Sequence, residues 1–213
     1  MTWMTIRLEL ARTREYPNGS SAHAYMLRLP LGADGLPTGE LKGPEVMMPV
    51  LVALGIGRDL FAGDEVGIRA FGRLAVRAGV TTATDLASTL TEPEVQALLR
   101  VTAEADHPVR LVPLLRLIGL RPSEAVARAL ALRERETDLV RLGRIKVVAD
   151  GSIQGFSARL LWPGYFNGAP PGLWYTPPET VRECYTLALR AGVPVHTHTN
   201  GDEATEMALD CMA

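Results

Sequence analysis

Two histidines stand two residues apart in the segment Gly192–Asp202, which reads as a short apolar strand followed by a turn. Side chains alternate along a strand, so His196 and His198 are expected on one face and Thr197 on the other. Two neutral imidazoles at the carboxyl end of a strand commonly present nitrogen ligands to a divalent metal. The alternative is that one ring caps a turn and the other is a hydrogen-bonded core residue. Of the two interpretations, the pair favours a metal site.

A lysine lies in the preceding expected strand, 144–150, where alternation puts Lys146 and Asp150 on the same side. An unpaired ammonium between Ile and Val is costly in a strand that is buried on both faces. The lysine can therefore pair with a carboxylate, reach the surface or lose its charge. In its neutral form, such an amine can react with carbon dioxide to give a carbamate, an anionic ligand able to bridge two metal ions. A structural ion pair is the other interpretation, and the imidazoles on the next strand favour the metal ligand.

Two more aspartates follow predicted strands. Asp85 ends the β-branched stretch 79–85, where an aspartate is often only a turn former or the cap of the next helix. Asp202 follows Asn-Gly and opens a helix, for which a capping role is expected.

The elements that must position these residues alternate regularly from residue 79 onward. Strands are expected at 79–85, 109–115, 144–150 and 192–199, with helices over 92–105, 123–142, 177–191 and 202–213. Near-continuous apolar strands separated by helices predict an α/β fold with a parallel sheet that is covered on its faces. In such folds chemistry collects at the carboxyl ends of the strands. Ahead of this region the pattern predicts helices over 45–54 and 64–78 and a hairpin around Asp34-Gly35.

The composition is that of an ordinary soluble globular protein, with 47% hydrophobic and 22% charged residues among 213. A formal net charge of −2 gives no indication of a nucleic-acid or anionic-membrane partner. The sequence shows neither a signal peptide nor an apolar run long enough to cross a membrane, so a cytoplasmic location is expected. Cys184 and Cys211 lack a Cys-x-x-Cys spacing and are expected to be buried free thiols.

Five segments, in order, resemble the amidohydrolase superfamily, and more closely its family 3 branch, which includes N-substituted formamide deformylase-like enzymes. They are Asp34–Leu41, Gly79–Asp85, Gly143–Ser152, Gly172–Glu179 and Val195–Ala204. The resemblance covers the chain from about residue 32 to the end. It implies a (β/α)8 TIM-type barrel that holds one or two divalent metals, usually zinc. Metal-activated hydroxide would attack the carbon–nitrogen bond of a small amide-like substrate.

Residue by residue, Lys146 resembles the lysine that becomes carboxylated on the fourth strand of the family's barrel. His198 resembles the metal histidine of the fifth strand, while His196 has no obvious counterpart and is either an alternative ligand or a donor that supports one. Asp150 and Asp202 are the candidates for catalytic-site carboxylates, expected to orient the metal ligands.

The departures from the family predict an incomplete enzyme. The first-strand His-x-His pair, the sixth-strand histidine and the eighth-strand aspartate have no counterpart. We therefore expect a partial barrel, about strands 2 to 5, in residues 63–213, preceded by a hairpin and helical insertion in residues 1–62. Open strand edges favour a homo-oligomer or a complementing polypeptide. A non-catalytic remnant and a small-molecule-binding α/β segment without metal remain alternatives, whereas the absence of Gly-rich phosphate signatures argues against a nucleotide module.

Overall fold

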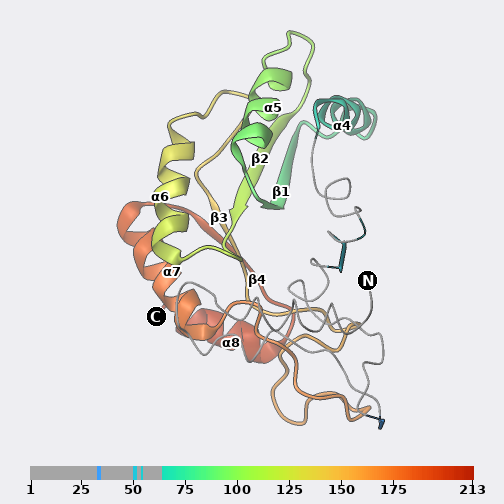
Figure 1. The fold of residues 1–213 in the computed structure, drawn as a ribbon, viewed down its shortest axis with the longest axis vertical. Coiled ribbons are helices and arrows are strands. Elements are labelled where there is room, and N and C mark those ends of the chain that lie inside the picture. Colours follow the sequence, from blue (N-terminus) through green and yellow to red (C-terminus); the bar gives the residue numbers. More distant parts are fainter. Residues whose placement is uncertain (1–32, 35–49, 52–53, 55–63) are drawn as a thin grey trace.

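The computed structural model describes residues 33–34, 50–51, 54 and 64–213 (Figure 1). From residue 64 onward, helices and strands alternate as the sequence pattern predicts. They are α4 Glu65–Arg77, β1 Thr82–Ser88, α5 Glu92–Thr102, β2 Arg110–Arg116, α6 Pro122–Arg133, β3 Ile145–Val148, α7 Pro178–Ala191, β4 Val195–His198 and α8 Asp202–Asp210. The strands form one sheet in the order β1-β2-β3-β4, and every neighbouring pair is parallel. The predicted parallel α/β sheet is therefore confirmed.

Local sequence signals explain where the helices begin and end. In α5 the Glu94 carboxylate accepts a hydrogen bond from the backbone N–H of Thr91, which satisfies one of the free donors at the helix start. Proline stands in the first turn of α5, α6 and α7, where its missing N–H costs nothing. Gly192 follows the last residue of α7 and caps the helix. Its φ of 62° is the left-handed conformation that glycine adopts without a steric penalty.

The largest core lies between β3 and helices α6 and α7, which cover one face of the sheet (Figure 1). From β3, Ile145 and Val147 enter this core and are fully buried. The face of β3 that carries Lys146 therefore points away from these helices, toward what would be the inside of a barrel. The Thr197 hydroxyl of β4 lies 2.6 Å from the Tyr185 hydroxyl of α7, so the Thr197 side chain is on the side of the sheet that faces α7. His196 and His198 accordingly share the opposite face, as the alternation predicts.

The prediction of one helix over 123–142 is wrong in its second half. Helix α6 ends at Arg133, and the chain then runs beside β2, where Val140 forms a parallel bridge with Leu111. Val140 and Leu142 are fully buried in a core cluster with Leu115. Their apolar side chains belong to an extended segment, which helical spacing alone does not distinguish from a buried helix.

The boundaries of two strands also differ from the prediction. Strand β1 continues to Ser88, so Asp85 lies inside it, next to an irregularity in its pairing with β2. Strand β3 ends at Val148, and Asp150 forms an isolated bridge with Trp174 in the loop that follows. The predicted hairpin and the 45–54 helix fall largely outside the described residues; Asp34 lies in a turn, and residues 50 and 51 are helical. The proposed division at residues 62 and 63 stays a prediction.

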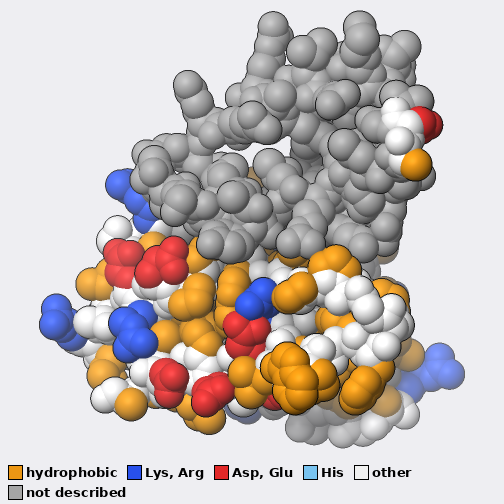
Figure 2. All heavy atoms as spheres, turned by 90° about the horizontal axis from the view of Figure 1, so that it is seen from below, with side chains coloured by type: hydrophobic (Ala, Val, Ile, Leu, Met, Phe, Trp, Pro, Cys, Tyr) orange, Lys and Arg blue, Asp and Glu red, His pale blue; other side chains and the backbone are white. Residues whose placement is uncertain are grey.

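Acidic, basic and apolar side chains of the described residues are interspersed on the face that Figure 2 shows. That face carries no continuous region of one charge sign within the part that is described. Among the described residues, no helix is long and apolar enough to cross a membrane.

Candidate active site

The pairing of β3 with β4 brings three predicted ligands onto one face of the sheet. Lys146 is in register with His196, and Val148 is in register with His198. Registered residues of neighbouring parallel strands project to the same side, so the lysine and both imidazoles face the same space. The sequence predicted this convergence because it placed the residues on successive strands and assigned each to a face.

Lys146 is 5% exposed, and its Nζ lies 3.2 Å from Nδ1 of His196. No carboxylate of the described residues forms an ion pair with it, and burial lowers the pKa of the ammonium. The pKa of His196 is also lowered, first by desolvation and then by the positive charges of Lys146 and His198. The alternative interpretation, a structural ion pair between Lys146 and a carboxylate, therefore finds no support in the described contacts.

His198 is half-buried, and its Nε2 lies 3.5 Å from the carbonyl oxygen of Gly151, a long hydrogen bond. The two histidines are thus oriented by opposite nitrogens, because His196 meets Lys146 through Nδ1. Nε2 of His196 and Nδ1 of His198 take no part in these two contacts.

The donor set fits part of a divalent-metal site. Two imidazoles suit zinc and related ions, and a lysine that is buried without an acid partner suits conversion to an anionic oxygen ligand. Among the described residues, however, no group of three or more His, Cys, Asp or Glu side chains could hold a metal. Lys146 would complete a set of three only as its carbamate, so these residues could supply some, but not all, of the ligands of such a centre.

Asp150 is fully buried, and backbone N–H groups surround its carboxylate. Its Oδ2 accepts from the N–H groups of Arg159 and Gly201 at 2.9 and 2.8 Å, and its Oδ1 accepts from Asn200 at 2.9 Å. These contacts tie the ends of β3 and β4 to the loop after β3. The Asp150 carboxylate therefore holds these backbone segments together next to the candidate active site.

Asp202 is the first residue of α8, with Gly201 as the N-cap, so the predicted capping role falls one residue earlier. Its Oδ1 accepts hydrogen bonds from the backbone N–H groups of Leu161 and Glu203, at 2.8 and 2.9 Å. The contact with Leu161 fixes the loop after β3 to the start of α8. Whether Asp150 or Asp202 takes part in a reaction stays a prediction.

Two residues near the site were missed by sequence reasoning. Arg116, at the end of β2, is in register with Lys146, which makes a row of basic side chains with His196 across three strands. The sequence signal that could have identified Arg116 is a charged residue directly after the apolar run 111–115. Asn200 donates from Nδ2 to the Gly151 carbonyl at 2.8 Å, whereas the sequence predicts only a turn at its Asn-Gly step.

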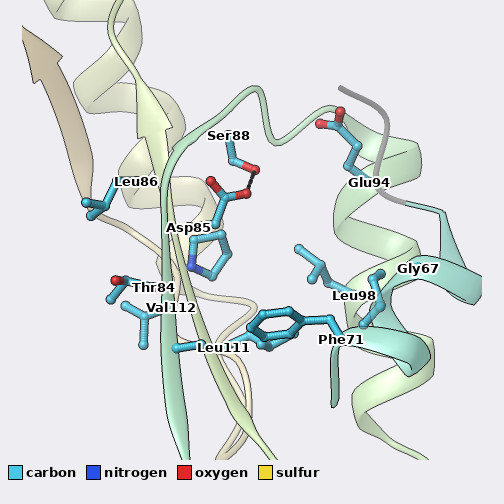
Figure 3. A pocket seen from close by; sticks show the side chains of 13 residues that line it. Gly67, Phe71, Thr84, Asp85, Leu86, Ser88, Glu94, Leu98, Leu111 and Val112 are labelled. Atoms are coloured by element: carbon cyan, nitrogen blue, oxygen red, sulfur yellow. Dashed lines mark hydrogen bonds between the residues drawn. The ribbon is translucent and has the colours of Figure 1, made fainter. Parts of the chain in front are cut away.

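A pocket of about 560 Å³ lies elsewhere, between α4, α5 and the strands β1 and β2 (Figure 3). Phe71, Leu98 and Leu111 supply apolar walls, and Asp85 adds a carboxylate. That carboxylate is already bonded to the Ser88 hydroxyl, at 2.9 Å, and to a backbone N–H. The pocket contains neither Lys146 nor the two histidines, so it is separate from the candidate active site.

The fold and the site together define a segment of a parallel βα barrel that carries metal-type ligands on the inner face of two adjacent strands. The family model described as the amidohydrolase family matches residues 7–213, and the chain belongs to that family. No curated protein matches the sequence.

Two solved structures are similar to this chain, both crystal structures of uncharacterized metal-dependent hydrolases. The one from Pyrococcus furiosus has a TM-score of 0.57 and 19% identity, over 81% of this chain and 35% of its own. The one from Pyrococcus horikoshii OT3 has a TM-score of 0.57 and 15% identity, over 89% of this chain and 37% of its own. At this identity the likeness is one of fold. It confirms the expected fold class, part of a (β/α)8 TIM-type barrel, and this chain spans just over a third of the length of either structure.

Proposed function

We propose that this chain forms part of a metal-dependent hydrolase that acts on the carbon–nitrogen bond of a small amide-like substrate. The observation that carries the proposal is the 3.2 Å approach of the buried Lys146 Nζ to His196, on the face that also holds His198. Membership of the amidohydrolase family and the similarity to two metal-dependent hydrolases support it. The resemblance to the N-substituted formamide deformylase-like branch suggests the substrate class.

In this proposal Lys146, as its carbamate, and His198 hold a divalent metal, most simply zinc. Such a metal, when bound, lowers the pKa of a coordinated water so that hydroxide forms near neutral pH. His196 either contributes a further ligand or holds the lysine through Nδ1. Asp150 and Asp202 keep the loop after β3 and the start of α8 in place around these ligands.

We further propose that activity needs polypeptide beyond these 213 residues. The two similar structures are almost three times as long as the part that matches here, and a closed barrel has no strand edge. The remaining ligands would come from further strands of the same protein or from a complementing polypeptide, and a homo-oligomer is a further possibility for the open sheet. A cytoplasmic location, without nucleic-acid or membrane partners, fits the composition.

Metal retention tests this proposal. The chain, either alone or completed by the rest of the barrel, should keep zinc or another divalent metal after dialysis against metal-free buffer, as elemental analysis measures. His198→Ala should reduce the retained metal to below about a tenth of the wild-type amount, since even loss of a supporting contact typically costs ten- to a hundredfold in affinity. The matched control is His107→Ala, because the His107 ring contacts only the Val109 carbonyl, at 3.0 Å, in a different loop.

A non-catalytic remnant is the second candidate. It is favoured by the lack, in the described part of the chain, of a group of three His, Cys, Asp or Glu side chains able to hold a metal. The two candidates separate when the assay is repeated on the chain together with the polypeptide that completes the barrel. Metal in neither preparation would favour the remnant.

A further inference from the structure

A partly buried hydrogen-bond cluster joins the carboxyl ends of β3 and β4 to the loop after β3. We name it the Asp150 clasp, and it consists of the Asp150 carboxylate, the three backbone N–H groups of Arg159, Asn200 and Gly201, and the Asn200 side chain. The partners are 9, 50 and 51 residues from Asp150 in sequence. The clasp therefore exists only when both strands and the loop are in place.

The packing around the clasp leaves no room for a side chain at either of two glycines, Gly201 and Gly151. A Cβ added to Gly201 would lie 1.6 Å from the carbonyl oxygen of Arg159. On the other side, a Cβ at Gly151 would lie 2.1 Å from Oγ of Ser157. Ser157 Oγ in turn accepts from the backbone N–H of Ser152 at 2.9 Å. Contacts this close show that the backbone segments around Asp150 are packed directly against one another.

Asn200 links the clasp to the candidate active site. Its backbone N–H donates to Asp150, and its side-chain Nδ2 donates to the Gly151 carbonyl at 2.8 Å. That same carbonyl oxygen lies 3.5 Å from Nε2 of His198. A carbonyl has two lone pairs and can accept from both donors at once. The Asn200 amide therefore fixes the acceptor against which the His198 ring is oriented.

We propose that Asn200 is a positioning residue for His198. It holds the Gly151 carbonyl as the acceptor for an Nε2–H donor, so that Nδ1 of His198 keeps its lone pair. A histidine tautomer is set by the hydrogen bond that its other nitrogen makes. His196, whose Nδ1 meets Lys146, has no such carbonyl among the described contacts, so the two imidazoles are not equivalent.

The tautomer can be measured without substrate or metal. Nitrogen NMR of the 15N-histidine-labelled chain, recorded above about pH 8 so that the rings are neutral, distinguishes Nε2–H from Nδ1–H. The His198 signal is assigned by its loss in His198→Gln. We expect His198 to be mainly the Nε2–H tautomer in the wild type and a mixture of both in Asn200→Asp, which keeps the size of the side chain but removes its donor.

Three further measurements make the test decisive. Asn200→Ala, which removes the amide without adding charge, should also give a mixture, and both variants should keep the wild-type circular dichroism. The control Asn167→Asp makes the same change in the loop after β3, where Asn167 accepts only from the nearby Ala169 N–H, and should change nothing. Zinc titration should show about ten- to a hundredfold weaker binding in both Asn200 variants.

The metal part of the inference rests on the proposed function, whereas the tautomer part does not. If no variant binds zinc but the tautomer still shifts, the metal proposal fails and the positioning role stands. An Nδ1–H tautomer in the wild type, or an unchanged tautomer in both folded Asn200 variants, would overturn the role of Asn200.

Discussion

Two aspartates of the same sheet region, Asp85 inside β1 and Asp150 just after β3, have opposite environments. Asp85 in β1 is exposed and bonds only to the Ala87 N–H and the Ser88 hydroxyl, two and three residues away. Asp150 after β3 is fully buried and bonds to backbone groups up to 51 residues away. In sequence the two look alike, because each aspartate ends a predicted strand. Only one of them ties distant segments together.

The strands behind these aspartates differ in the same way. All of β3 is buried or half-buried, and it packs into the core under α6 and α7. In β1 most residues are exposed, and its contribution to a core is limited to Ala83, packed against a small cluster of three buried residues. The comparison shows that β3, which carries Lys146, is far more deeply buried than β1.

Asp150→Ala should have the largest effect. It would leave three buried or half-buried backbone N–H groups without an acceptor, each costing about 1–3 kcal/mol, so the free energy of unfolding should fall by at least about 3 kcal/mol. Urea denaturation followed by circular dichroism measures it. The control Asp85→Ala should stay within about 0.5 kcal/mol of the wild type, as is usual for exposed positions. Equal losses at the two positions would contradict the comparison.

Gly201→Ala should come next, with a loss of about 1–3 kcal/mol, the usual cost of forcing extra volume into a packed region. The new Cβ would meet the Arg159 carbonyl and push the loop after β3 away from β4. Gly79→Ala, ahead of β1, is the matched control. Its φ of 72° predicts a backbone penalty of about 1–2 kcal/mol, yet no atom lies within 4 Å of the added Cβ.

The two glycine variants should differ in kind as well as in size. Gly201→Ala should weaken zinc retention because the clasp adjoins His198, whereas Gly79→Ala should lower stability without changing the retained metal. Loss of metal in both variants would show that the two halves of the sheet are coupled.

The Cys184 thiol lies in the core cluster that also contains Ile145 and Val147 of β3. Burial, with a smaller contribution from the Glu183 charge, raises the pKa of this thiol to about 11. The folded state then binds more protons than the unfolded state, so stability should fall as the pH rises from about 8.5 toward 11, by up to about 1.4 kcal/mol per pH unit. Cys184→Ala should flatten that part of the stability profile, measured by urea denaturation at successive pH values. An equal slope in both proteins would show that the thiol is hydrated.

Asp202→Ala should have the smallest effect, about 1 kcal/mol, and it separates two explanations. Asp202 bonds to Leu161, 41 residues away, but it is exposed, so it combines the long range of Asp150 with the exposure of Asp85. A small loss in urea denaturation would mean that burial decides the contribution of such a carboxylate. A loss as large as that of Asp150→Ala would mean that the range of the contact decides it.

The sequence by itself determined the alternation of strands and helices, the parallel sheet and the face shared by Lys146, His196 and His198. These follow from apolar periodicity and from the two-residue repeat of a strand, which are local properties. Local patterns failed where an element depends on a distant partner, as at Val140, which pairs with Leu111 instead of continuing α6.

Only the tertiary structure decided which aspartate holds distant backbone segments together and which groups orient the imidazoles of His196 and His198. The partners of Asp150, and the Gly151 carbonyl that Asn200 and His198 share, come from segments that are about 50 residues apart. Hydrogen bonds of this kind leave no periodic trace in the chain, because each needs one donor and one acceptor that only the folded backbone brings together.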